Sequence, residues 1–304
     1  MASDGPFRGL LERGANLTLE NRRQIESVSE YLRLVADEAT WVWKRCQADM
    51  QRNSDLGQPN QIHEIAPFHF LYTITRAVDA IQILVSECAI AGAIPIVRSE
   101  WESYVNLKAL LSDPDRLDER CRAWLAAYIH GRQKAYRGIL DHVEVRPDRE
   151  PGLRREQARL EAYARQEPIR RVYEKLAGLP EHQRQWYRLA FDEKTSSIYA
   201  LADRVGLKQE YVGLYADWSS MVHEGALHRI MRSDVPVNSI ENIRGMSQLK
   251  EVALAAGGYA LDAIVMMLNQ YRPGEDIRKL SRFPRILQLR QWVSGIRIVD
   301  RERE

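Results

Sequence analysis

Apolar residues recur every three or four positions along most of this chain, which is the pattern of helices with one buried face. The clearest case runs from Leu19 to Arg52. Its apolar positions are Ile25, Val28, Leu32, Val35, Ala39 and Val42. Thr18 stands just before this segment, where its hydroxyl is suited to cap the first turn. No segment keeps a two-residue alternation between turn signals. The pattern therefore predicts an all-α fold, a bundle of long antiparallel helices without significant β-sheet.

Turn-forming residues divide the rest of the chain into further helices. We expect loops or breaks at residues 53–60, at Gly92 and Pro95, and at residues 146–151, with an irregular stretch at 178–194. The remaining expected helices cover residues 67–91, 95–111, 115–143, 153–176, 196–205, 208–232, 246–271 and 276–293. Asp113 is expected to cap the helix that starts at residue 115. Gly206 is expected to end the helix over residues 196–205.

Three parts follow from this division. An N-terminal helix and loop (residues 1–60) packs on a main helical bundle (residues 61–272), and a basic amphipathic segment (residues 273–304) ends the chain. With 304 residues, 45% of them hydrophobic, the chain can bury a sizeable core.

Composition and charge exclude few classes of function. The formal net charge of +2 gives no argument for nucleic acid or for a membrane. The three cysteines, Cys46, Cys88 and Cys121, form no CxxC pair, which fits a reducing cytosol better than a disulfide framework. The N-terminus lacks a secretory pattern, and the longest apolar run is too short to span a bilayer. We expect a soluble cytoplasmic protein with no membrane association.

Two polar stretches interrupt the apolar helices, at residues 96–104 and 211–225. In the first, Arg98 falls in the apolar stripe of its helix, and Glu102 lies one turn further on. Unpaired in a core, either charge would cost several kcal/mol by order of magnitude, so both should have partners.

In the second stretch, Tyr211, Tyr215 and Trp218 form the apolar stripe, and Ser219 and His223 flank it. We expect Arg98, Glu102, Ser219 and His223 to meet across a helix–helix contact, with Tyr215 nearby. Such a cluster could bind an anion such as phosphate, or run acid–base chemistry with Glu102 orienting His223. The alternative, which base rates favour, is a buried polar knot that fixes the pairing of two helices.

These motifs support a resemblance. The residues concerned are Arg98 and Glu102 (RxxxE), then Tyr211, Tyr215, Ser219 and His223 (YxxxYxxxSxxxH). Over about residues 65–270, the chain resembles a bacterial all-helical family known only as a domain of unknown function. The resemblance implies an all-α fold without an established activity, and it favours Arg98, Glu102 and His223 as the site. Glu224 departs from the expected small or neutral residue, which disfavours a strongly anionic ligand.

A second resemblance concerns Arg137 and His142, whose spacing is similar to that of the Arg/His pair in helical ribonucleases of the HEPN class. It would imply metal-independent RNA cleavage. Gly138 replaces the polar residue that this class usually has there. The alternative is that His142 is an exposed residue at a helix C-terminus.

The basic C-terminal segment contains no Asp or Glu between residues 277 and 299. Its candidate nucleic-acid-binding residues are Arg278, Lys279, Arg282, Arg285 and Arg290. Nucleic acid would be attracted by this charge and could stack on the interleaved aromatic residues. The alternative, again favoured, is a terminal helix that docks its apolar side and solvates its arginines.

No metal site or cofactor is expected. His223 and His228 are one residue too far apart for HExxH, and His63, Glu64 and His69 lack further ligands. No phosphate-binding glycine loop is present. The leading hypothesis is a nucleic-acid-associated protein, either a HEPN-like ribonuclease or an RNA-binding component of a defence or stress system. The rival hypothesis is a non-catalytic interaction or scaffold module that works as a homodimer or with a protein partner. A sensor or enzyme for a small phosphorylated ligand is a third.

Overall fold

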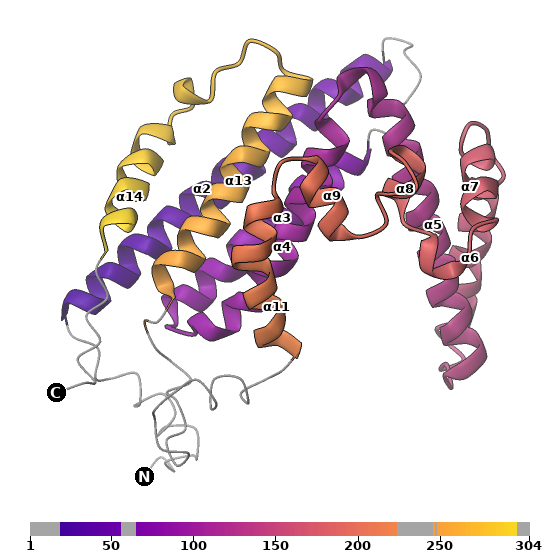
Figure 1. The fold of residues 1–304 in the computed structure, drawn as a ribbon, viewed down its shortest axis with the longest axis horizontal. Helices are drawn as coiled ribbons and strands as arrows, with labels where there is room; N and C mark the ends of the chain where they lie inside the picture. Colours follow the sequence, from indigo (N-terminus) through magenta and orange to yellow (C-terminus); the bar gives the residue numbers. More distant parts are fainter. Residues whose placement is uncertain (1–18, 56–64, 224–245, 247, 297–304) are drawn as a thin grey trace. The chain divides into compact units, whose positions relative to one another are not determined.

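The protein is an assembly of α-helices. The computed structural model describes residues 19–55, 65–223, 246 and 248–296. Of the described residues, 82% are helical and none lies in a strand, which confirms the all-α prediction (Figure 1). The contacts divide the chain into two compact units.

The first unit comprises Met1–Gln58, Phe70–Asn106 and Gln209–Glu304. Its elements are α2 (Leu19–Asp55), most of α3 (Ile65–Ser86) and of α4 (Ile90–Leu111), η4 (Tyr211–Tyr215, a π-helix), α11 (Ala216–His223), α13 (Leu249–Tyr271), η5 (Ile277–Lys279) and α14 (Phe283–Gly295). The short α10 (Lys208–Glu210) leads into η4. Helix α2 packs along α13 and α14, and all three lie side by side in Figure 1.

The core of this unit is dense where α2 crosses α13. Tyr31 is fully buried and lies directly against Gly257, where a Cβ atom would overlap the Tyr31 ring. The missing side chain therefore lets the two helices approach closely. Trp101 of α4 is also fully buried. Burial of large side chains from several helices supplies the main stabilisation of this unit.

The second unit comprises Pro59–His69 and Leu107–Lys208. Its elements are η2 (Pro114–Arg116), α5 (Leu117–His142), α6 (Glu150–Ala164), α7 (Ile169–Ala177), η3 (Glu181–Gln183), α8 (Trp186–Ala190) and α9 (Ile198–Arg204). Helix α5 packs against α6, α7 and α8.

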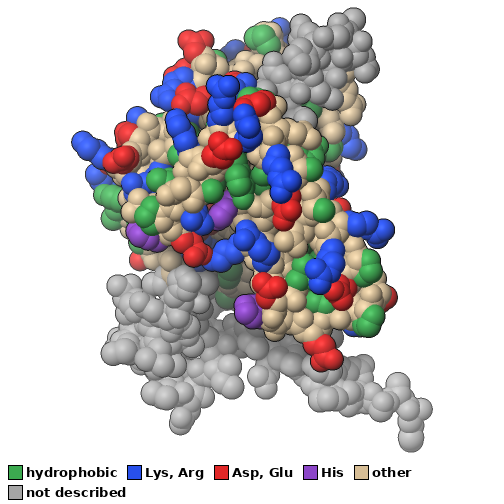
Figure 2. Space-filling model, turned by 90° about the vertical axis from the view of Figure 1, so that its right-hand side faces the viewer, with side chains coloured by type: hydrophobic (Ala, Val, Ile, Leu, Met, Phe, Trp, Pro, Cys, Tyr) green, Lys and Arg blue, Asp and Glu red, His purple; other side chains and the backbone are tan. Residues whose placement is uncertain are grey.

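A small core joins α5 to the next two helices. Its buried members are Ala126, Ile129, Ala164 and Ile169. Acidic and basic side chains are intermixed on the face of the molecule that Figure 2 shows. On α6, Arg154 pairs with Glu150 at 2.7 Å. The charged side chains of α6 therefore form a solvated face.

Several predicted helix ends are confirmed. The Asp113 carboxylate accepts a hydrogen bond from the Asp115 N–H at 3.2 Å, as a cap does. Ser197 caps α9 in the same way, and Gly206 follows that helix with a φ of 78°. Helix α2 matches the predicted segment and extends to Asp55, so residues 53–55 are helical where a loop was predicted. Thr18 and residues 56–60 lie outside the described residues.

The predicted break at Gly92 and Pro95 is wrong by several residues. Helix α3 ends at Ser86 and α4 already begins at Ile90, so Pro95 lies inside α4. The chain turns at Cys88, which adopts the left-handed conformation with a φ of 58°. The N–H of the next residue donates to the Leu84 carbonyl at 2.8 Å, which closes the helix end as a glycine usually does.

The predicted single helix over residues 153–176 is also wrong. Helix α6 starts earlier, at Glu150, and ends at Ala164, and α7 begins only at Ile169. Pro168 stands at the start of α7, and because proline lacks an N–H and constrains the residue before it, one helix cannot run through. The predicted helix 208–232 contains η4 and α11, and residues 224–232 lie outside the described residues.

Helix α13 is the one described helix whose length and composition would also suit a membrane span. In the structure, 61% of its apolar window is buried against other helices. A buried core helix of a soluble protein passes the same test, so the finding does not assign a location.

Candidate functional site

A cluster of polar side chains joins α4 to η4. On α4, Arg98 and Glu102 are one turn apart and form an ion pair of 3.2 Å. Helical spacing places them on the same face, as the sequence predicted. Both remain accessible, since 22% of the Arg98 side chain and 39% of the Glu102 side chain are exposed. The pair therefore lies at the edge of the core rather than inside it.

Tyr215 connects this pair to the second helix. Its hydroxyl donates to Glu102 Oε1 at 2.6 Å and accepts from the Arg98 guanidinium at 3.0 Å. The guanidinium also lies over the Tyr215 ring, 5.1 Å from its centroid. A single buried phenol thus contacts both charges, and each of these bonds joins residues more than one hundred positions apart in the chain.

Aromatic packing fixes the position of that phenol. The Tyr215 ring lies 4.6 Å from the Trp101 ring and is stacked on Tyr211 at 4.9 Å, between centroids. Trp101 is fully buried, so it holds Tyr215 on a rigid support. The π-helix η4 carries both tyrosines, and wide turns of this kind are frequent at functional sites.

The electrostatics of the cluster favour its present protonation states. The hydrogen bond with Tyr215 raises the pKa of Arg98, which stays charged. Burial raises the pKa of Tyr215, and its hydrogen bond to Glu102 adds to the effect, so the phenol keeps its proton. The Nε atom of Arg98 is buried and has no protein acceptor. The cluster therefore offers a fixed cation, an accessible carboxylate and a protonated phenol.

The structure brings together three of the residues that the sequence grouped: Arg98, Glu102 and the neighbouring Tyr215. Ser219 is half-buried on α11, one turn beyond Tyr215. His223 is the last described residue of α11, about 12 Å beyond Tyr215 along the helix at 1.5 Å per residue. Its side chain lies outside what the structure describes, so the meeting of His223 with Arg98 stays a prediction.

Sequence reasoning missed Glu100, which lies two residues from Arg98. Its side chain is fully buried, and neither carboxyl oxygen has a hydrogen-bond partner. Burial raises the pKa of Glu100 well above its usual value of 4.5. A signal was present in the sequence, because Glu100 shares a helical stripe with Val97, Tyr104 and Leu107, all of which are buried.

The basic C-terminal segment is largely used in packing. Arg282 pairs with the buried Glu38 at 3.4 Å, Arg285 with Glu30 at 2.8 Å, and Arg278 with Asp276 at 2.9 Å. On α14, Ile286, Leu289 and Val293 are buried. Lys279 and Arg290 are exposed. This arrangement favours the docked-helix alternative, while nucleic-acid binding by these residues stays a prediction.

The second candidate pair lies in the other unit. Arg137 and His142 are exposed near the end of α5, and Arg137 Nε donates to the Gln133 carbonyl at 3.4 Å. His63 and Glu64 lie outside the described residues, and the His69 ring is tilted by 41° against the Trp124 ring, with centroids 5.2 Å apart. Within the described ranges, no three His, Cys, Asp or Glu side chains gather in a way that could hold a metal ion.

The fold and the cluster together define a class of protein. It is all-α, and Arg98, Glu102 and Tyr215 join two helical segments that are far apart in the sequence. A family model described as a family of unknown function (DUF5677) matches residues 64–236, more than half of the chain. The chain belongs to this family, which confirms the resemblance to an uncharacterised helical family. The matched range contains Arg98, Glu102, Tyr215, Ser219 and His223. No curated protein and no solved structure matches the chain significantly.

Proposed function

We propose that this protein is a cytoplasmic, nucleic-acid-associated protein that binds RNA at the Arg98 cluster and cleaves it there without a metal ion. The observation that carries the proposal is the position of the Arg98 guanidinium. It is fixed by Tyr215 and Glu102, yet 22% of the side chain is accessible. A fixed guanidinium with free N–H groups suits a phosphodiester, because its fork of donors matches two phosphate oxygens. The cytoplasmic location rests on three free, buried cysteines.

The chemistry would need one proton acceptor near the phosphate. His223 is the candidate, because an imidazole titrates near neutral pH. It would remove the proton from the ribose 2′-hydroxyl, whose oxygen attacks the neighbouring phosphorus. The bond to the 5′-oxygen of the next nucleotide breaks, and that oxygen receives a proton from the imidazolium. Arg98 would stabilise the negative charge that develops on the phosphate oxygens. A 2′,3′-cyclic phosphate would be the product.

The test is cleavage of a mixed set of RNAs by the purified full chain in the presence of a chelator. We expect the wild-type protein to cleave RNA. Arg98→Ala and His223→Ala should each reduce the cleavage rate at least a hundredfold. His223→Ala should do so without lowering the melting temperature. His142→Ala is the matched control and should cleave normally. If His142→Ala were the one variant that lost cleavage, the catalytic site would lie on α5 instead. If the wild-type protein cleaved none of the RNAs, the enzymatic proposal would be rejected.

RNA binding is measured separately. Binding at low salt that weakens with rising salt, and more so in Arg98→Ala, would support the binding part of the proposal even without cleavage. Equal affinity of the wild-type protein and Arg98→Ala would reject it.

A second candidate function is a non-catalytic interaction module. The specific observation in its favour is that the Tyr215 hydroxyl forms a hydrogen bond with each charged group of the cluster, as expected of a polar link that fixes two helices. This candidate predicts no RNA cleavage, a large loss of stability in Arg98→Ala, and self-association or capture of a defined partner. Sedimentation of the wild-type protein as a monomer across a wide concentration range would count against the homodimer form.

A further inference from the structure

One face of α2 is joined at two points to the segment that follows α13. Glu38 accepts a hydrogen bond from Arg282 at 3.4 Å, and Asp49 pairs with Arg272. The two acidic residues are eleven positions apart, which is about 16 Å along a helix. Residues 272–282 therefore lie along α2 between two ion pairs.

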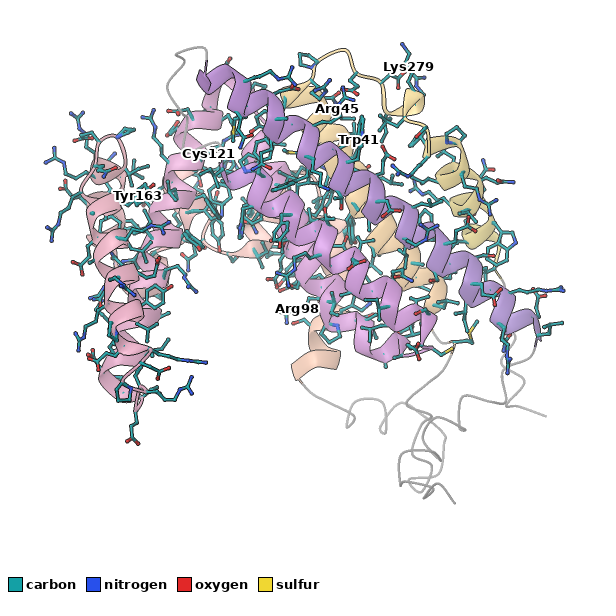
Figure 3. All side chains as sticks on the ribbon, turned by 180° about the vertical axis from the view of Figure 1, so that it is seen from behind. Trp41, Arg45, Arg98, Cys121, Tyr163 and Lys279 are labelled. Atoms are coloured by element: carbon teal, nitrogen blue, oxygen red, sulfur yellow. The ribbon has the colours of Figure 1, made fainter. Side chains whose placement is uncertain are left out.

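A cavity of about 470 Å³ opens between these two attachment points. Trp41 and Arg45 line it from α2, because they share a helical stripe with Glu38 and Asp49. Lys279, on η5, lines it from the other segment, and Figure 3 shows the three side chains in this part of the molecule. A volume of this size is within the range of small-molecule sites.

The acidic residues around the cavity all have a basic partner, but two of the basic residues have no acidic partner among the described residues. The pairs are Glu38 with Arg282, Glu275 with Arg272, and Asp276 with Arg278. Arg45 and Lys279, in contrast, form no ion pair with any residue in the described part of the chain. The cavity therefore presents two uncompensated positive charges to a ligand.

A flat surface lies beside these charges. The Arg45 guanidinium sits over the half-buried Trp41 ring, 4.6 Å from its centroid. Planar heterocycles stack on indole rings and on guanidinium groups, and phosphate groups take hydrogen bonds from Arg and Lys. A ligand that uses all three side chains carries both an anionic group and a planar ring.

We propose that this cavity binds a nucleoside monophosphate, with its phosphate held by Arg45 and Lys279 and its base stacked at Trp41. The site shares no residue with the Arg98 cluster, and the proposal does not depend on RNA cleavage there. It also lies outside the range that the family model matches, since that range begins at residue 64 and ends at residue 236.

The experiment is isothermal titration calorimetry of the full chain with AMP, adenosine and inorganic phosphate. We expect AMP to bind at least tenfold more tightly than either of the other two probes. Arg45→Ala combined with Lys279→Ala should weaken AMP at least tenfold, and Trp41→Leu should weaken AMP while leaving phosphate unchanged. All these side chains are at least partly exposed, so thermal unfolding should confirm that the variants fold.

Two control variants make the result specific. Arg33→Ala removes an exposed arginine of the same helix, one that pairs with Asp37 away from the cavity lining, and should bind AMP like the wild type. Arg98→Ala should also bind AMP normally, which separates this site from the proposed RNA site. Absence of AMP binding, equal affinity for phosphate alone, or undiminished binding by the Arg45/Lys279 double variant would overturn the proposal.

Discussion

The buried Glu100 gives a sharp prediction about how stability depends on pH. The perturbation is Glu100→Gln, which keeps the size of the side chain and removes its ability to ionise. In the native protein the Glu100 carboxyl group is fully buried and has no hydrogen-bond partner. Ionising it there would leave an uncompensated charge in the core, so the native protein retains the proton.

The magnitude follows from proton linkage. Burial raises the native pKa of Glu100 above the value of 4.5 that applies to an exposed glutamate. Below pH 4.5 both the native and the unfolded chain carry the proton, and the contribution of Glu100 to stability is fully present. Between 4.5 and the raised pKa, only the unfolded chain ionises. The free energy of unfolding then falls by about 1.4 kcal/mol for each pH unit.

The assay is urea unfolding of wild type and Glu100→Gln, followed by circular dichroism from pH 4 upward. The two proteins should be nearly equal at pH 4, and the variant should become the more stable one as pH rises, at about 1.4 kcal/mol per pH unit until the native carboxyl ionises. Taking the difference between the proteins cancels the titration of other groups. A pH-independent difference would refute the reasoning, because it would mean that Glu100 is ionised or paired in the native state.

Four further substitutions test packing and polar contacts, each by denaturant unfolding. Gly257→Ala should destabilise the protein by about 1–3 kcal/mol, because the added Cβ would overlap Tyr31; Gly138→Ala, with open space around it, should be neutral or stabilising by about 0.5–1 kcal/mol. Tyr215→Phe should lose about 1–2 kcal/mol, since both partners of its hydroxyl lose a hydrogen bond. Arg120→Ala should cost about 2–3 kcal/mol, because a buried guanidinium that binds two carbonyls at the end of α4 is removed. An unchanged midpoint for Gly257→Ala, Tyr215→Phe or Arg120→Ala, or a lowered midpoint for Gly138→Ala, would contradict these expectations.

The periodicity of apolar residues was sufficient to predict the fold class and the position of nearly every long helix. Errors arose where one backbone feature outweighed the pattern. At Cys88 the chain adopts a conformation usually left to glycine, so composition gave no signal of the helix end. At Pro168 the signal was present, but the continuous periodicity on both sides obscured it.

The candidate site was predictable to the extent that it depended on local spacing. The pairing of Arg98 with Glu102 follows from a separation of four residues, and the approach of Tyr215 followed from two interrupted apolar stripes. The cavity near Trp41 could not be found in this way. Its lining comes from two segments more than two hundred residues apart, and no periodicity relates α2 to the turn at Lys279.

The wide turn of η4 has a consequence for the register of everything that follows it. A π-helix accommodates one residue more than an α-helix of the same rise. Deleting a single residue from this turn would let it close as ordinary α-helix, so the segments on either side would keep nearly the same rotation relative to each other. Tyr211 and Tyr215, which both contact Trp101, would then be three positions apart and would still share one helix face. The wide turn can thus hold one more residue than an α-helical turn without changing which side chains of the flanking segments face the same neighbour.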